Sequence, residues 1–369
     1  MPEESIPFLS LVSQHQPIGR EVEEALMRVY TSHWYVLGHE VDAFEKEYAA
    51  HNGVNFCVGV GNGLDALTIS LLACGVGAGD EVIVPAHTYL ATWLAVSKTG
   101  ATLIPVEPDE FTCNVAPAGI EPRITARTKA ILPVHLYGQA CDMTAIASLA
   151  DKYNLAIIED NAQAHGSMWL KTKTGSWGKA NATSFYPTKN LGAMGDGGAI
   201  TTDNEAVARF AKQYRNYGFE VKNMAIHQGV NSRLDELQAA VLRIKLRQLD
   251  LWNDQRRQLA VLYLEQLKDT GDIILPLSDK EAYHVYHLFV IRTQHRDALK
   301  AHLAKKGIET MIHYPVPPHL QKCYEHLSFR KGEFPLTEKI AETALSLPLW
   351  PGMTPSQVAR VCDAVRSFF

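Results

Sequence analysis

The chain has 369 residues, of which 46% are hydrophobic and 20% are charged, and its formal net charge is −5 at pH 7. This composition is that of a globular protein with a sizeable core, and the length favours two domains over one. The acidic balance argues against a nucleic-acid partner, and the sequence contains neither an apolar run long enough to cross a membrane nor a secretory signal at its start.

After a polar, helix-like opening, strand and helix patterns alternate from about residue 55 to residue 215. Short apolar runs predict strands at residues 56–60, 81–86, 102–107, 129–136 and 155–160. A helical pattern at 142–154 offers Asp142 as its N-cap. Strands that are apolar throughout and separated by helices are typical of an α/β domain, with a mainly parallel sheet covered by helices on both faces.

A long helical pattern at residues 231–267 is expected to lead out of this large domain. Beyond it, the pattern predicts a strand and two helices, at residues 286–293, 295–307 and 354–369. The last helix begins with a capping box at Thr354. We therefore expect a large α/β domain at residues 1–250 and a smaller α+β domain at residues 251–369.

Three predicted strand ends carry residues suited to chemistry, and ligands of open α/β sheets bind beyond the carboxyl ends of the strands. The first strand runs into Gly59, Gly61 and Gly63 and then into a helix. Glycines at a helix N-terminus let backbone N–H groups approach a phosphate, which the helix dipole also favours. A tight structural turn explains these glycines equally well, because their spacing is not that of the dinucleotide fingerprint.

The other two strand ends contribute a carboxylate and an amine. In "LAIIEDNAQAHG", Asp160 ends an apolar run and Gln163 follows in the next loop. Taken alone, Asp160 fits a metal ligand, a ribose anchor, a helix cap or the partner of a cationic ring nitrogen. In "SFYPTKNLGAMGDGGA", Lys189 lies in an apolar, glycine-rich setting, where desolvation lowers the pKa of an amine and makes it nucleophilic. A phosphate cradle, an acid and a nucleophilic lysine are together what pyridoxal 5'-phosphate (PLP) needs.

The segments "EDNAQAHG", "SFYPTKNLGAMGDGGA" and "GVNSRLDELQAA" together resemble the DegT/DnrJ/EryC1/StrS family of PLP-dependent sugar aminotransferases, over nearly the whole chain. The resemblance implies the aspartate-aminotransferase-like fold (fold type I) and a homodimer with shared active sites. It also implies that Lys189 is catalytic and links covalently to PLP. The other implied cofactor contacts are Asp160 to the pyridinium nitrogen, Gln163 to the ring hydroxyl, Tyr89 on the ring face, Gly63, Leu64 and Ser184 to the phosphate, and Asn231 to the phosphate from the other subunit.

Several of these roles have a purely structural alternative. Tyr89 also fits core packing, Ser184 an ordinary strand residue, and Asn231 the cap of the helix that follows it. In "ETMIHYPVPPHLQ", the resemblance suggests His313 and Tyr314 as contacts of the sugar substrate, joined by Tyr186. The alternative for these is a proline-rich loop whose aromatic rings pack locally.

The resemblance implies a reaction in which L-glutamate gives its amino group and becomes 2-oxoglutarate, and a nucleotide-linked ketosugar accepts it. "VPAHTYLATWLAV", "SFYPTKNLG" and "IHYPVPPH" look most like the branch that aminates C3 of dTDP-linked 3-keto-6-deoxyhexoses. The alternative is a C4 aminotransferase acting on a 4-keto-6-deoxyhexose. Lys189 argues against the dehydratase branch, which carries histidine there. A nicotinamide-dependent oxidoreductase is more remote, because the strand at 81–86 ends without the acid it requires.

The remaining expectations concern metals and compartment. The six cysteines are scattered without a C-x-x-C pair, which favours reduced thiols over disulfides or a zinc site. His284 and His287 lack further ligands at suitable spacing, so a structural role is expected for both. We expect a cytoplasmic enzyme of deoxyamino-sugar biosynthesis (surface polysaccharide or glycoside), without metal, nucleic-acid or membrane partners.

Overall fold

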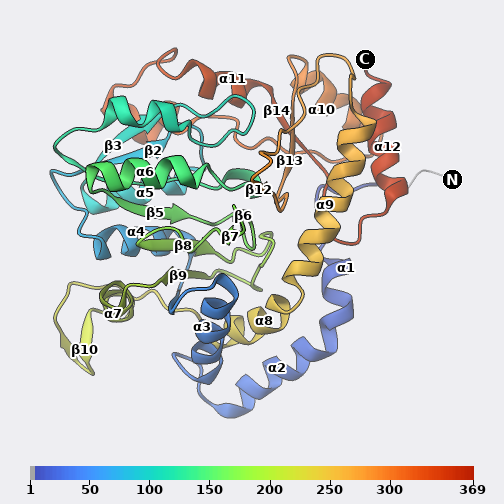
Figure 1. The fold of residues 1–369 in the computed structure, drawn as a ribbon. Coiled ribbons are helices and arrows are strands. Elements are labelled where there is room, and N and C mark those ends of the chain that lie inside the picture. Colours follow the sequence, from blue (N-terminus) through green and yellow to red (C-terminus); the bar gives the residue numbers. More distant parts are fainter. Residues whose placement is uncertain (1–4) are drawn as a thin grey trace.

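The computed structural model describes residues 5–369. A seven-stranded sheet lies at the centre of the large part of the molecule (Figure 1), in the order β1-β9-β8-β5-β4-β2-β3. In that order the strands span Phe56–Val60, Gly198–Thr202, Ala180–Ser184, Ala156–Asp160, Thr128–Ile131, Glu81–Pro85 and Thr102–Val106. Only β9 runs against its neighbours, β1 and β8, and the other pairs are parallel. The predicted, mainly parallel sheet is confirmed.

The predicted apolar runs form strands at or within a residue of the expected positions, except that β4 is shorter than predicted. It ends at Ile131, although the apolar run continues to residue 136. Pro133 has no N–H to donate to a neighbouring strand. Pairing resumes only as an isolated bridge between Val134 and Asp160.

Helices cover both faces of this sheet, as expected for the fold class. Val82 and Val84 of β2 pack into one hydrophobic core, and Ile83 between them packs into another. Because successive strand residues point to opposite faces, the two cores lie on opposite sides of the sheet. The helices of this part are α3, α4, α5, α6 and α7, at His39–Asn52, Gly63–Ala73, Leu90–Thr99, Met143–Tyr153 and Glu205–Tyr214. The predicted cap of α6 is confirmed, since the Asp142 side chain accepts a hydrogen bond from the Ala145 N–H.

The long helical pattern at 231–267 forms two helices instead of one. They are α8 (Glu236–Leu246) and α9 (Leu249–Gln266), and the chain turns between them at Arg247 and Gln248, where ψ is −17° and −10°. No proline or glycine marks this turn, so the sequence carries no signal for it. The residue that precedes α8 is Asp235, so Asn231 does not cap it and that alternative is wrong. Helix α8 packs against α2 (Gly19–Ser32) and α3.

The C-terminal region has a hydrophobic core of its own. Strands β13 (Phe289–Arg292) and β14 (Ala344–Leu347) pair antiparallel and pack with α9, α10 (Arg296–Lys305) and α12 (Pro355–Arg366). The capping box predicted for the last helix is confirmed at Thr354. The domain division after residue 250 falls in the first turn of α9 and stays a prediction.

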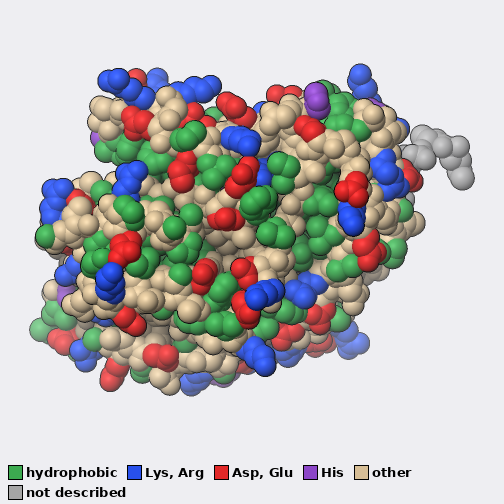
Figure 2. Space-filling model, turned by 45° about the horizontal axis from the view of Figure 1, so that its top comes forward, with side chains coloured by type: hydrophobic (Ala, Val, Ile, Leu, Met, Phe, Trp, Pro, Cys, Tyr) green, Lys and Arg blue, Asp and Glu red, His purple; other side chains and the backbone are tan. Residues whose placement is uncertain are grey.

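Short elements complete the described chain. They are α1 (Val12–His15), α11 (Pro335–Thr343), β6 (Met168–Trp169), β7 (Thr172–Lys173), β10 (Phe219–Val221), β11 (Met224–Ala225), β12 (Ala282–Tyr283) and the 3-10 turns Gln16–Ile18, Pro117–Gly119, Glu121–Arg123, Leu136–Gly138, Pro318–Leu320 and Lys322–Leu327. Within residues 5–369, none of the helices combines the length and apolarity needed to cross a bilayer. Figure 2 shows acidic and basic side chains interspersed over the face in view.

Candidate active site

A cavity of about 860 Å³ lies beyond the carboxyl ends of the central strands. Asp160 and Ser184 are the last residues of β5 and β8, and Gly63 and Tyr89 follow β1 and β2. Every predicted site residue except Asn231 lines this one cavity, namely Gly63, Leu64, Tyr89, Asp160, Gln163, Ser184, Tyr186, Lys189, His313 and Tyr314. The fold therefore brings together segments that lie up to about 250 residues apart in the sequence.

One end of the cavity is suited to an anion. Helix α4 begins there, capped by Asn62, whose Oδ1 accepts the Asp65 N–H at 2.8 Å. The N–H groups of Gly63 and Leu64 belong to the first turn and have no acceptor within the helix. A Cβ at Gly63 would lie 2.6 Å from the Ser184 Cβ, so only glycine allows this close approach of α4 to β8. These N–H groups and the positive end of the helix dipole form a cradle for a phosphate.

A buried carboxylate, that of Asp160, also lines the cavity. Its Oδ2 accepts the Thr92 hydroxyl at 2.9 Å, and its Oδ1 accepts the Ala162 N–H at 3.1 Å. Burial raises the pKa of Asp160, and these hydrogen bonds and the charge of Lys189 oppose that shift. A cationic N–H in the cavity would stabilise the ionised form further, as a protonated ring nitrogen does.

Lys189 lies between the carboxylate and a group of histidines. It follows β8, and its backbone N–H closes a turn onto the Tyr186 carbonyl at 2.8 Å. Burial lowers the pKa of Lys189 to about 8, against the opposing effect of Asp160. The pKa values of His165 and His313 are lowered to about 3 and about 4, mainly by burial, so both rings are neutral at neutral pH. Lys189 can therefore gain and lose a proton near neutral pH, as a nucleophile or proton shuttle must.

Gln163 belongs to a hydrogen-bond network that the sequence did not reveal. Its Oε1 accepts the Tyr137 N–H at 2.7 Å, and its Nε2 donates to the Tyr314 hydroxyl at 2.8 Å. The Tyr137 hydroxyl donates to the His313 carbonyl at 2.5 Å and also contacts the His87 ring at 2.9 Å. Tyr137 thus connects Gln163 with the segment predicted to contact substrate.

Two of the aromatic residues at the cavity, Tyr89 and Tyr186, are not core residues. The side chains of Tyr89 and Tyr186 are 57% and 52% exposed, so core packing is the wrong interpretation of Tyr89. The Tyr89 ring lies 5.2 Å from that of Tyr314, measured between centroids. These rings give the open side of the cavity an aromatic surface on which a planar group can stack.

Asn231 lies outside the cavity of its own chain. Its side chain is exposed, and its backbone forms an isolated bridge with Asn216. In this single chain Asn231 is therefore not part of the cavity wall, although the next residue, Ser232, accepts the Gly61 N–H just before α4 and donates to Asp65.

Sequence reasoning missed other residues around the cavity, chiefly Thr92, Tyr137 and Arg256. The segment "HTYLATW" held a usable signal, because Thr88 and Thr92 lie one helical turn apart and their hydroxyls are 2.9 Å from each other. His287 is buried and contacts the Asn190 side chain at 3.1 Å. Among residues 5–369, no three histidine, cysteine or acidic side chains lie where they could hold a metal ion together.

Comparison with known proteins identifies relatives over the whole chain. The sequence profile of the DegT/DnrJ/EryC1/StrS aminotransferase family matches residues 16–366. The chain is 50% identical to the dTDP-3-amino-3,6-dideoxy-alpha-D-galactopyranose transaminase of Aneurinibacillus thermoaerophilus, over 98% of this chain and 99% of that protein. It is 47% identical to the dTDP-3-amino-3,4,6-trideoxy-alpha-D-glucose transaminase of Streptomyces venezuelae, over 98% and 96% of the two chains. Its fold matches the crystal structure of S. venezuelae DesV in complex with a ketimine intermediate, with a TM-score of 0.97 and 46% identity over 99% of both chains.

Proposed function

We propose that this chain, which belongs to the DegT/DnrJ/EryC1/StrS aminotransferase family, transfers an amino group from L-glutamate to C3 of a dTDP-linked 3-keto-6-deoxyhexose. The family is PLP-dependent, and both transaminases compared above are named for dTDP-linked 3-amino sugars. The observation that carries the proposal is the single cavity that holds Lys189, Asp160 and the N-terminus of α4 together. These three features together fit a PLP-dependent aminotransferase and do not favour the alternative of a nicotinamide-dependent oxidoreductase.

The residues of the cavity fit PLP. The α4 N-terminus with Gly63, Leu64 and Ser184 would hold the phosphate, and the Asp160 carboxylate would face the ring nitrogen. Gln163 would bond the ring hydroxyl, and Tyr89 would cover the ring face. When bound, PLP supplies an electron sink for the carbon that gains or loses the amino group.

The protein side of the reaction depends on Lys189. With its pKa lowered to about 8, Lys189 can take a proton from the amino donor and return one to the sugar carbon at neutral pH. The carboxylate of Asp160 would supply the negative charge that keeps the ring nitrogen protonated. Tyr186, His313 and Tyr314 would orient the sugar so that C3 faces Nζ of Lys189, which is what positions a single carbon for reaction.

A homodimer would complete the phosphate site. Large apolar side chains are exposed near Asn231, with 64% of Trp34, 42% of Val36 and 38% of Val230 accessible. Val36 forms a bridge with Asp235, so these residues lie on neighbouring segments. A second copy covering this surface would bury them and let Asn231 reach the phosphate of its partner.

The proposed compartment is the cytoplasm. All six cysteines of the sequence lie among the described residues, and each is unpaired in the structure. Free thiols persist in reducing compartments, which supports this proposal.

The first half of the reaction offers a direct test. Purified protein with PLP should show a visible absorption band that borohydride abolishes. Peptide mapping of the reduced protein should find the PLP group attached to Lys189. Adding L-glutamate without sugar should release one 2-oxoglutarate per site and stop. If the protein binds PLP but releases no 2-oxoglutarate, L-glutamate is not the amino donor. If the protein does not retain PLP, the proposed PLP-dependent activity is wrong.

A further inference from the structure

Arg292 is a buried cation without a hydrogen-bond partner for its terminal nitrogens. It is the last residue of β13, and 4% of its surface is exposed. Within residues 5–369, neither Nη1 nor Nη2 has a hydrogen-bond partner. The Glu110 carboxylate approaches Nη1 to 3.8 Å, beyond hydrogen-bond reach, and it also binds Lys339 at 3.0 Å. The guanidinium is therefore only weakly compensated.

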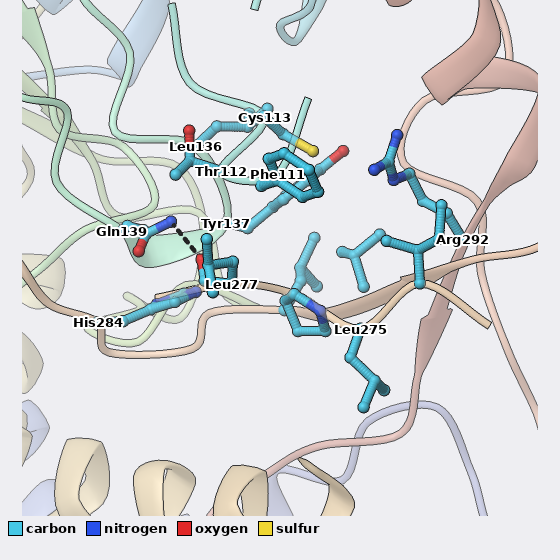
Figure 3. A pocket seen from close by; sticks show the side chains of 14 residues that line it. Phe111, Thr112, Cys113, Leu136, Tyr137, Gln139, Leu275, Leu277, His284 and Arg292 are labelled. Atoms are coloured by element: carbon cyan, nitrogen blue, oxygen red, sulfur yellow. Dashed lines mark hydrogen bonds between the residues drawn. The ribbon is translucent and has the colours of Figure 1, made fainter. Parts of the chain in front are cut away.

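The guanidinium lines a small pocket of about 20 Å³, separate from the active-site cavity (Figure 3). The walls come from the 111–113 loop, the 136–139 turn and the 274–277 segment, together with β13. Figure 3 shows the Arg292 guanidinium on the same side as the Cys113 thiol. The pocket thus joins the C-terminal region to loops at the edge of the large sheet.

The other residues that line the pocket carry no charge at neutral pH. Burial lowers the pKa of His284 to about 3 and raises that of Cys113 to about 11, so both side chains are neutral. The Gln139 amide already donates to the Leu277 carbonyl, at 3.1 Å (dashed line in Figure 3). The Tyr137 hydroxyl donates to His313 outside the pocket. Arg292 is therefore the charged residue that lines this pocket, and its terminal N–H groups are the main hydrogen-bond donors there without a partner.

The charge and the size of the pocket together indicate its ligand. A buried guanidinium whose terminal nitrogens lack hydrogen bonds is unfavourable, and the Glu110 carboxylate at 3.8 Å offsets its charge only in part, so an anion beside Arg292 would stabilise the fold. A volume of roughly 10–15 Å³ is needed for one water molecule, so the pocket has room for one small particle and is too small for an amino acid. We propose that this pocket binds a single halide ion, chloride under physiological conditions, held by Nη1 and Nη2 of Arg292.

Chloride should then stabilise the protein by mass action. The melting temperature of the holoenzyme would be measured as chloride replaces gluconate, an anion too large for the pocket, at constant ionic strength. We expect the melting temperature to rise and saturate for the wild type, and to be independent of chloride for Arg292→Gln. Lys331→Gln, which removes a surface charge paired with Glu342 and not with Glu110, should keep the chloride dependence.

Crystals of the wild type soaked in bromide give a readout that needs no variant. We expect an anomalous peak within hydrogen-bond distance of the Arg292 nitrogens. The absence of such a peak would overturn the proposal, and so would equal stabilisation of wild type and Arg292→Gln by chloride. A bromide peak without any chloride dependence of the melting temperature would mean an adventitious ion only, and would also overturn it.

Discussion

At the scale of single residues, the site depends on how burial changes the charge of Lys189. Removing water from the amine disfavours its protonated form, and Asp160 restores only part of that loss. The neighbouring histidines are neutral for the same reason, so they neither compete for protons near pH 7 nor cancel the charge of Asp160. Lys189 therefore titrates closer to neutral pH than either of these histidines.

The first prediction concerns the pH dependence of this lysine. In the apoenzyme, reductive methylation of Lys189 should rise with pH and reach half of its maximal rate near pH 8. The neutral amine is the reactive form, and an unperturbed lysine reaches that point only at about pH 10.4. Mass spectrometry of the Lys189 peptide at a series of pH values gives the profile, and the urea-unfolded protein is the control. A profile in the folded protein that matches the unfolded one would contradict this account.

A second prediction concerns Asp160. Asp160→Asn keeps the shape of the side chain and its bond from Thr92, but it cannot hold a ring nitrogen protonated. We expect turnover to fall at least about 100-fold, which corresponds to roughly 3 kcal/mol of transition-state stabilisation. PLP affinity should fall much less, because the phosphate contacts are unchanged. The two effects are separated by measuring the single-turnover rate and the PLP dissociation constant of the same preparation. Near-normal turnover would contradict the pairing of Asp160 with the ring nitrogen.

The site residues predicted from sequence are those that belong to local motifs. Lys189 and Asp160 each stand in a short segment whose apolar or glycine-rich setting is visible in the sequence itself. Tyr137 and Thr92 act through partners that are 26 and 68 positions away, Gln163 and Asp160. Such pairings become visible only when the segments are placed side by side, although the spacing of Thr88 and Thr92 marks Thr92 within its own segment.

At the scale of elements, the junction of α4 with β8 forms the proposed phosphate cradle. The helix supplies N–H groups and a positive end, and Gly63 lets it lie against Ser184. Patterning predicted the strand and the glycine turn here, because both are local. It did not predict the turn between α8 and α9, where helical periodicity continues through Arg247 and Gln248 without a breaking residue.

A third prediction tests this junction. Gly63→Ala would place a methyl group 2.6 Å from the Ser184 Cβ, so α4 must move away from β8. We expect PLP affinity to fall at least about 10-fold, or roughly 1.4 kcal/mol. Gly77→Ala is the matched control, since a Cβ there meets no atom within 4 Å. Titration of the apoenzymes with PLP, followed by absorption, compares the two variants, and equal affinities would exclude the cradle.

At the scale of the whole molecule, one chain brings every predicted site residue except the exposed Asn231 into one cavity. The apolar residues beside it, Trp34 and Val36, indicate a surface that a second copy would cover. The sequence resemblance suggested this sharing of sites, and a single chain cannot display it.

The fourth prediction concerns subunit sharing. Lys189→Ala and Asn231→Asp should each be inactive alone, the latter because its charge repels a phosphate. A mixed dimer contains one site with both native residues, so random exchange should restore about a quarter of wild-type activity. Exchange is verified by native mass spectrometry with one tagged partner. If verified mixed dimers remain inactive, the lysine and the asparagine act within one chain.

Amination at C3 of a dTDP-linked ketosugar is tested by locating the transferred nitrogen. The enzyme would be incubated with PLP, nitrogen-15-labelled L-glutamate and either the 3-keto or the 4-keto isomer of a dTDP-linked 6-deoxyhexose, and the product examined by NMR. We expect the 3-keto isomer to be converted and the label to couple to the proton on C3. Preferred conversion of the 4-keto isomer, with the label on C4, would contradict this expectation.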